Sequence, residues 1–67
     1  MSRLRVTHVN FAVRIGVAVP RTFRLFVVPE EIVVIVPRFR HYRCFIFDSE
    51  LVIVDPVTFF IVAIIPI

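Results

Sequence analysis

Residues Leu51–Ile65 read LVIVDPVTFFIVAII, and this stretch decides the fold. Two apolar runs, Leu51–Val54 and Phe59–Ile65, flank the turn sequence Asp55-Pro56-Val57-Thr58. Aspartate at the first position of a β-turn accepts hydrogen bonds from the backbone ahead of it, and proline pre-sets φ at the second position. The stretch therefore predicts a β-hairpin. Because Leu51–Val54 is apolar at every position, we expect a central strand that is covered on both faces.

The segments on the N-terminal side of this hairpin extend the sheet and add one helix. Tyr42–Phe47 is a further apolar strand, joined to Leu51–Val54 by a turn at Asp48-Ser49, so that the C-terminal half is an antiparallel three-stranded meander. Pro29–Val36 begins with proline and two glutamates, which favours the start of a helix. Five consecutive β-branched residues disfavour that helix, so a strand or turn is the alternative.

The N-terminal part alternates between apolar and small or polar residues. Over Val6–Val19 the apolar residues recur with a period of two, which predicts a half-buried strand that ends at Pro20. Thr22–Val28 has the same period and predicts a second strand, which ends at Pro29. The expected fold is α+β and nearly all-β: two N-terminal strands, one short helix or turn, then the meander. Residues 1–67 form one domain, with a lead-in at 1–8.

Apolar residues are in excess for so short a chain. Of the 67 residues 60% are hydrophobic, and the single cysteine, Cys44, allows no intrachain disulfide. An exposed apolar surplus marks an interface or an aggregation risk. Adjacent strand residues face opposite sides, so we expect an outer patch that leads to self-association or to binding of another protein. The candidate interface residues are Leu51, Ile53, Phe59 and Phe60.

Charge is divided between the two halves of the chain. All eight basic residues are arginines between Arg3 and Arg43, and only two glutamates oppose them there, which leaves +6. Three of these arginines, Arg38, Arg40 and Arg43, surround aromatic residues and are candidate anion-binding groups. An anionic polymer, a lipid headgroup or an anionic envelope surface would suit them. Nucleic acid is not expected, because the basic stretch is narrow and lacks lysine.

No pattern indicates catalysis or a bound cofactor. Zinc takes four ligands, usually as two close pairs in sequence, whereas the candidates here are only His8, His41 and Cys44. On a strand, positions 41 and 44 also point to opposite faces, which argues against a nucleophile and its base. The acidic residues of the C-terminal half stand in or beside turns. We therefore expect no metal, no cofactor and no enzyme.

Three stretches of the sequence resemble the bacterial DUF1236 family, whose members are domains of unknown function. They are VNFAVRIGVAVPR at Val9–Arg21, VVPEEIVVIVPRFRHYR at Val27–Arg43 and the opening LVIVDPVTFFIVAII, and the resemblance spans residues 9–65. It implies a domain of exported, envelope-associated proteins with no established activity. A periplasmic location would follow if a signal peptide has been removed or missed, and a cytoplasmic one otherwise.

Function is thus predicted only as a class. The longest apolar run, Phe59–Ile65, is much shorter than the roughly 20 residues of a membrane-spanning helix. A non-catalytic interaction or structural module accounts best for the strand edges and the apolar surplus. The alternatives are a binder of anionic polymers or lipid headgroups through the arginine cluster, and a truncated copy without independent function.

Overall fold

The computed structural model describes residues 4–67, so Met1–Arg3, which belong to the predicted lead-in, lie outside the described residues. One four-stranded sheet with the order β1-β2-β3-β4 forms the centre, and each strand is antiparallel to its neighbour. A short helix and a 3-10 turn lie between the first two strands. The elements are β1 (Phe26–Val27), α1 (Glu30–Ile35), η2 (Pro37–Phe39), β2 (Arg43–Phe47), β3 (Glu50–Val54) and β4 (Ile61–Pro66).

The predicted meander is confirmed as strands β2, β3 and β4. Phe47 pairs with Glu50, which leaves Asp48 and Ser49 as a two-residue loop with φ values of 54° and 64°. Positive φ at both positions is the pattern of a type I′ turn, whose twist matches that of the flanking strands. As expected for a central strand, β3 is buried on both faces from Leu51 to Val54.

The second hairpin turns at Asp55 by the predicted mechanism. Its carboxylate oxygen Oδ1 accepts hydrogen bonds from the Val57 N–H at 2.8 Å and the Thr58 N–H at 3.0 Å. These bonds lower the pKa of Asp55 because they stabilise the ionised carboxylate, and the bond from the Thr58 N–H has the larger effect. The loop continues through Phe59, which has a φ of 63°. The pairing of β3 with the start of β4 then contains a β-bulge, which falls between Ile53 and Val54 on β3. The hairpin loop is therefore longer than the four-residue turn predicted.

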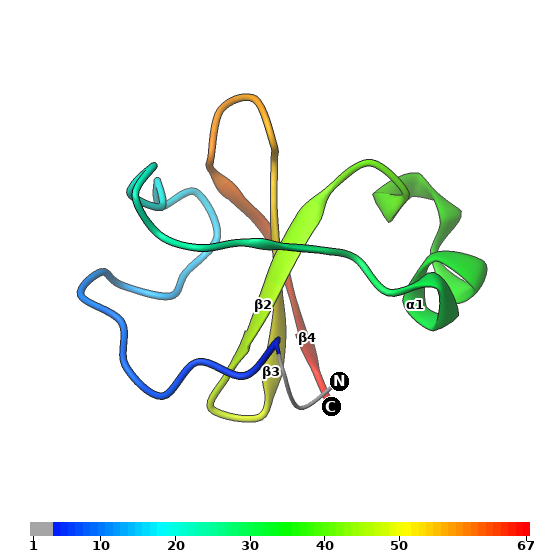
Figure 1. Ribbon diagram of the computed structural model, residues 1–67, viewed down its shortest axis with the longest axis horizontal. Coiled ribbons are helices and arrows are strands. Elements are labelled where there is room, and N and C mark those ends of the chain that lie inside the picture. The colour runs from blue at the N-terminus through cyan, green and yellow to red at the C-terminus, as the bar shows by residue number, and fades with distance from the viewer. Residues whose placement is uncertain (1–3) are drawn as a thin grey trace.

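Helix α1 resolves the ambiguity that the sequence left over Pro29–Val36. Pro29 is the N-cap, the two glutamates lie in the first turn, and Val33 is buried. The helix packs on one face of the sheet (Figure 1). The side chains that meet there form one core cluster: Leu4, Val28, Val33, Phe39, Cys44, Ile46, Leu51 and Ile53.

Residues 5–25, which we call the arm, cover the other face of the sheet and correct the prediction of a strand at Val6–Val19. The arm winds over that face as an irregular chain (Figure 1) and pairs with the sheet only at isolated bridges, Arg5 with Ile46 and Ala18 with Phe60. A sheet face offers no backbone hydrogen bonds, so a segment that lies across it gains packing without a ladder. The second predicted strand, Thr22–Val28, shrinks to Phe26–Val27.

The alternation of apolar residues survives in the arm although the strand does not. An extended chain places successive side chains on opposite sides whether or not its backbone pairs. The outlier is Ile15, which is 68% exposed beside Gly16, whose φ is 92°. The arm packs on a second core cluster, which consists of Val19, Phe45, Val52, Val54 and Ile61. The half-buried arm residues that contact this cluster are Val6, Val9, Phe11, Val13, Val17, Phe23 and Leu25.

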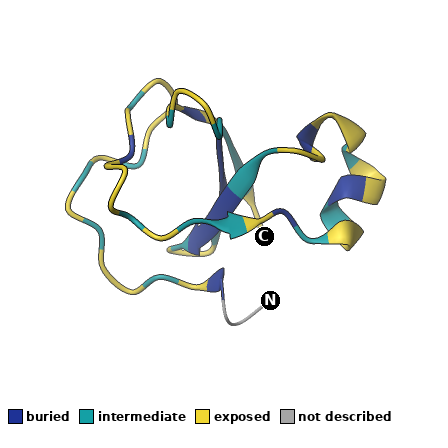
Figure 2. Ribbon diagram, turned by 45° about the horizontal axis from the view of Figure 1, so that its top comes forward, coloured by how far each residue is buried: buried dark blue, intermediate teal, exposed yellow. Residues whose placement is uncertain are grey.

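Three phenylalanines join the arm to the sheet. The ring centroids of Phe11 and Phe23 lie 5.1 Å apart, and those of Phe23 and Phe45 also lie 5.1 Å apart, all edge-on. Buried residues thus lie in the sheet between two covering layers (Figure 2). The radius of gyration is 10.8 Å, close to the roughly 11 Å of a compact chain of this length. The second face, which we expected to need a partner, is covered within the chain.

Candidate functional site

The predicted interface residues do not form one surface. Leu51 and Ile53 are fully buried beneath α1, which corrects their prediction as interface residues. Phe59 is half-buried, and the guanidinium of Arg21 lies 4.5 Å from its ring centre. Phe60 alone of the four is exposed, at 47%. Leu51 and Ile53 are buried because β3 is an interior strand of the sheet and a covering layer lies on each side of it.

The three candidate anion-binding arginines lie near one another along the chain but make different contacts. Arg38 is exposed, with its guanidinium 5.1 Å from the centre of the Phe39 ring. Arg40 forms an ion pair with Glu30 at 3.6 Å. Arg43 donates to the backbone carbonyls of His41 and Tyr42 at 3.4 and 3.3 Å. Of the three, only Arg38 has neither a carboxylate nor a carbonyl partner among the described residues.

Cys44 is a core residue. Its side chain is fully buried in the cluster beneath α1, and burial raises the pKa of its thiol to about 11. His41 is exposed at the start of the same segment. Within residues 4–67 no three histidine, cysteine or acidic side chains lie close enough together to hold a metal ion. These positions therefore bring no catalytic or metal-binding groups together.

The outer edge of β4 is partly closed: the backbone of Ile64, two residues before Pro66, faces outward by alternation and has no hydrogen-bond partner on that side among the described residues. At its start, the Ile61 N–H donates to the Val17 carbonyl and the Ile61 carbonyl accepts from Gly16, both in the arm. At its end, the Ile67 N–H donates inward to Ser49, so by alternation the backbone of Pro66 faces outward. Proline has no N–H to offer a further strand, and proline at an edge blunts pairing.

The outer edge of β1 is open by the same reasoning. Phe47 forms the last pair of the type I′ hairpin, so its backbone N–H and C=O point toward β3. Because these groups alternate in direction along a strand, those of Cys44, three residues earlier, point toward β1. Phe26 pairs with Cys44 and thus faces inward, which leaves Leu25 and Val27 facing outward. Among the described residues, one weak contact reaches these groups, from the Cys44 Sγ to the Val27 carbonyl at 3.8 Å.

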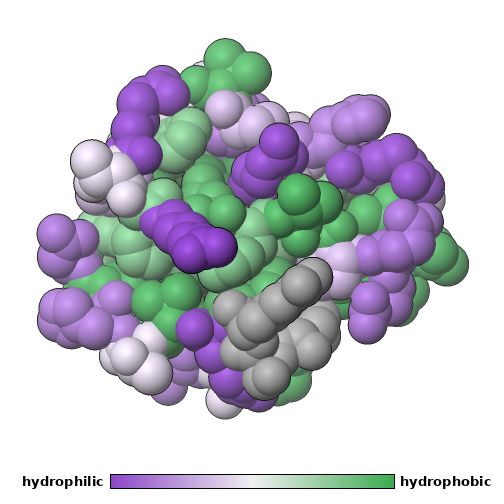
Figure 3. Space-filling view, viewed as in Figure 1, coloured by the Kyte–Doolittle hydropathy of each residue, from purple (hydrophilic) through white to green (hydrophobic). Residues whose placement is uncertain are grey.

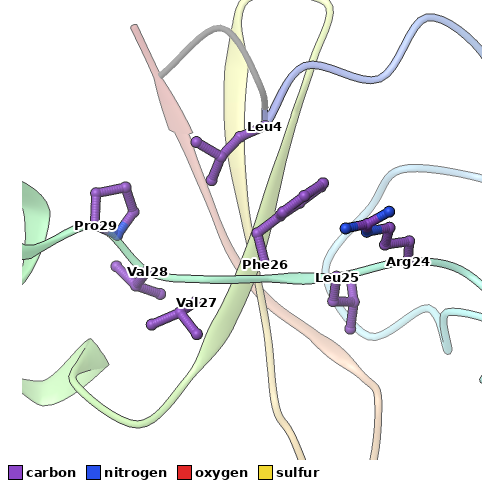
Figure 4. Close-up of a pocket in the computed structure, with 7 residues that line it drawn as sticks. All are labelled: Leu4, Arg24, Leu25, Phe26, Val27, Val28 and Pro29. Carbon is purple, nitrogen blue, oxygen red and sulfur yellow. The ribbon is translucent and has the colours of Figure 1, made fainter.

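A groove of about 390 Å³ runs along this open edge, and we call it the β1 groove. Arg24 and Phe26 extend to the side on which Leu4 lies, whereas Leu25 and Val27 extend to the opposite side (Figure 4). The same segment crosses the front of the molecule in Figure 1, and the surface there is apolar with hydrophilic side chains beside it (Figure 3). The lining residues are Leu4, Arg24, Leu25, Phe26, Val27, Val28 and Pro29.

Sequence reasoning placed Leu25 and Val27 in a strand but did not identify the edge. Their alternation indicates an extended segment, yet it does not tell which strand lies beside it. The edge position depends on the sheet order, in which β1 pairs only with β2. No local signal encodes that order.

The geometry defines a small α+β domain whose accessible feature is a strand edge beside an apolar groove. No described helix is long and apolar enough to cross a membrane. The profile of the DUF1236 family, described as a domain of unknown function, matches residues 2–66. The chain therefore belongs to this family, as its sequence resemblance indicated. No curated protein and no solved structure matches the chain.

Proposed function

We propose that this domain is a non-catalytic interaction module that binds an extended segment of another polypeptide by strand addition to β1. The observation that carries the proposal is the outward-facing backbone of Leu25 and Val27 beside the β1 groove. Strand addition takes its affinity from main-chain hydrogen bonds and its specificity from pockets for alternate side chains. The β1 groove supplies such a pocket, whereas β4 offers an outward-facing N–H only at Ile64, between the part paired with the arm and Pro66, among the described residues.

The expected affinity is modest. Each backbone hydrogen bond contributes about 0.5–1.5 kcal/mol net, and only Val27 of β1 and Leu25 directly before it face outward. Apolar side chains in the groove add about 25 cal/mol per Å² buried. The cost of ordering an extended peptide offsets part of this gain. We therefore expect micromolar or weaker binding for an isolated peptide.

Val27→Pro tests the proposal at a single N–H group. The side chain of Val27 is 67% exposed, so its loss removes little packing. Proline deletes the outward N–H, whereas the matched control Val27→Ala keeps it. Heptapeptides selected from a random library against the native domain supply the probe, and NMR titration measures binding. Binding should survive Val27→Ala and fall about two- to tenfold in Val27→Pro, as expected for the loss of one backbone hydrogen bond.

The fold of each variant is checked by its amide spectrum before titration. If Val27→Pro unfolds, hydrogen exchange of the native domain decides instead: bound peptide should slow exchange at the amides of Leu25 and Val27. Peptides that bind equally well to Val27→Pro, or that protect other amides, would remove the β1 edge as the binding element.

Self-association is the form of this function in which the partner is a second copy. Coverage of both sheet faces removes an uncovered sheet face as its basis, although large apolar side chains such as Val34 and Ile35 stay exposed, and the β1 edge is equally available to another copy. Sedimentation equilibrium of the native domain and Val27→Pro separates the two cases. Loss of a dimer in Val27→Pro alone would assign the edge to self-association.

Binding of an anionic ligand is a second candidate, supported by the exposed guanidinium of Arg38, which has no carboxylate or carbonyl partner within residues 4–67. It predicts earlier elution of Arg38→Gln than of Arg14→Gln from immobilised heparin. Equal elution of the two variants, which lose the same charge, would indicate that retention reflects net charge alone.

A further inference from the structure

We infer that the segment which adds to β1 carries a carboxylate side chain that pairs with Arg24. The inference rests on the proposed strand addition and names the chemistry of the partner. Three observations carry it: the position of Arg24 in the β1 groove, its lack of a carboxylate partner, and the net positive charge of the N-terminal part of the sequence.

Arg24 stands at one end of the groove lining, directly before the outward-facing Leu25. Its guanidinium carbon lies 5.5 Å from the ring centre of Phe26, which lines the same groove. The aromatic face holds the cation beside the position of an added strand, by a cation–π contact that leaves its N–H donors free for an anion. The side chain is thus held in place before a partner binds.

No carboxylate of the described chain lies within 4.0 Å of Arg24, since the ion pair there joins Arg40 to Glu30. The N-terminal part of the sequence, which supplies every residue of the groove lining, has a net positive charge. Residues 4–43 contain seven arginines and two glutamates, a net charge of +5, whereas residues 44–67 carry −3. Complementary charge steers a partner and selects among partners. An acidic segment therefore fits this edge better than a neutral or basic one.

The register of an added strand determines where the acid must stand. Side chains two residues apart share a face, so Arg24 and Phe26 face the same side of the partner strand. An antiparallel segment would place an apolar residue opposite Phe26 and the acid two positions later. A parallel segment would place the acid two positions before the apolar residue. The partner motif is one acidic and one apolar residue with a single residue between them.

Two synthetic peptides test this motif, Thr-Val-Thr-Val-Thr-Glu-Thr for antiparallel and Thr-Glu-Thr-Val-Thr-Val-Thr for parallel addition, both with blocked ends. In matched peptides glutamine or lysine replaces glutamate, and NMR titration measures each dissociation constant. An exposed ion pair predicts about two- to fivefold tighter binding of the glutamate peptide than of the glutamine peptide at low salt. The lysine peptide should bind more weakly than either, and added salt should reduce the preference.

Arg24→Gln should abolish the preference for glutamate, and the control Arg14→Gln, which removes the same charge from the arm, should retain it. Equal binding of glutamate and glutamine peptides that Val27→Pro nevertheless weakens would overturn the inference and leave strand addition intact. A glutamate preference that persists in Arg24→Gln would also overturn it. Failure of every peptide to bind in either orientation, or binding that Val27→Pro does not change, would overturn the proposed function itself.

Discussion

Removing one phenylalanine from the arm should expose the face of the sheet that the arm covers. Phe23 lies across from the fully buried Phe45, with ring centroids 5.1 Å apart, and edge-on to Phe11 at the same distance. Phe23→Ala deletes both aromatic contacts and leaves a gap over β2. We expect this single change to destabilise the domain strongly.

The size of the effect follows from burial and ring contacts. A fully buried Phe→Ala substitution costs about 3–5 kcal/mol, and Phe23 is half-buried, so roughly half of that applies. Each edge-on pair adds about 0.5–1.5 kcal/mol beyond area burial, and two are lost. The total is about 2.5–5.5 kcal/mol, against about 3–10 kcal/mol of stability for a domain of this length.

Urea unfolding of Phe23→Ala and a matched arm variant measures this effect. Ile15→Ala truncates another apolar side chain of the arm, but one that is 68% exposed, so it should change the free energy of unfolding by less than about 0.5 kcal/mol. Phe23→Ala should also bind a hydrophobic dye under native conditions, since it uncovers β2. Equal unfolding free energies for the two variants would refute the packing of the arm on the sheet.

Three further substitutions test the turns and the core. Hydrogen bonds hold the folded pKa of Asp55 below its unfolded value, so its contribution to stability is present above the unfolded pKa and is lost as pH falls through the folded pKa. The unfolding temperature of Asp55→Asn should therefore lie below that of the native domain at pH 7 and equal it in strong acid. A difference in unfolding temperature that does not change with pH would contradict the turn contacts. Ser49→Gly should raise the free energy of unfolding by about 0.5–1 kcal/mol, because glycine accepts the φ of 64° without strain, whereas a lower urea midpoint would contradict this. Cys44, fully buried and with a thiol pKa of about 11, should resist maleimide in the native state, and Cys44→Ala should cost roughly 1 kcal/mol; rapid native labelling would contradict its burial.

Sequence reasoning succeeded where local chemistry fixes the backbone. Pro29 and the two glutamates after it begin α1 although the following residues favour strands. Asp55 accepts the two N–H bonds that its turn sequence predicts. The uninterrupted apolar run Leu51–Val54 became the central strand, because only a strand covered on both faces can bury every residue. In each case a few neighbouring residues determine the result.

The same reasoning failed for the arm because its pattern has two solutions. Alternating burial at Phe11 and Val13 arises in a paired strand and equally in an extended chain that lies over a sheet. The choice between them depends on whether an edge is free to accept the segment. The arm reaches such an edge and pairs with it only at Arg5 and Ala18. The prediction of Leu51 and Ile53 as interface residues had a different source, the apolar surplus of so short a chain, and it is wrong because α1 covers the face on which they lie.

The candidate site follows from the way the arm is used. One stretch of the arm pairs with the start of β4, and Pro66 blunts that strand's other end, so this edge of the sheet is protected except at Ile64. The arm then crosses the face and continues into β1, and Arg5 reaches β2 beyond the end of β1. Between Leu4 and Pro29 this leaves the outward backbone of Leu25 and Val27 beside an apolar groove. Natural sheets usually protect such edges against unwanted pairing. An edge left open beside Arg24 and an apolar groove, in a chain that protects most of its other edge, is consistent with selective pairing by a partner strand.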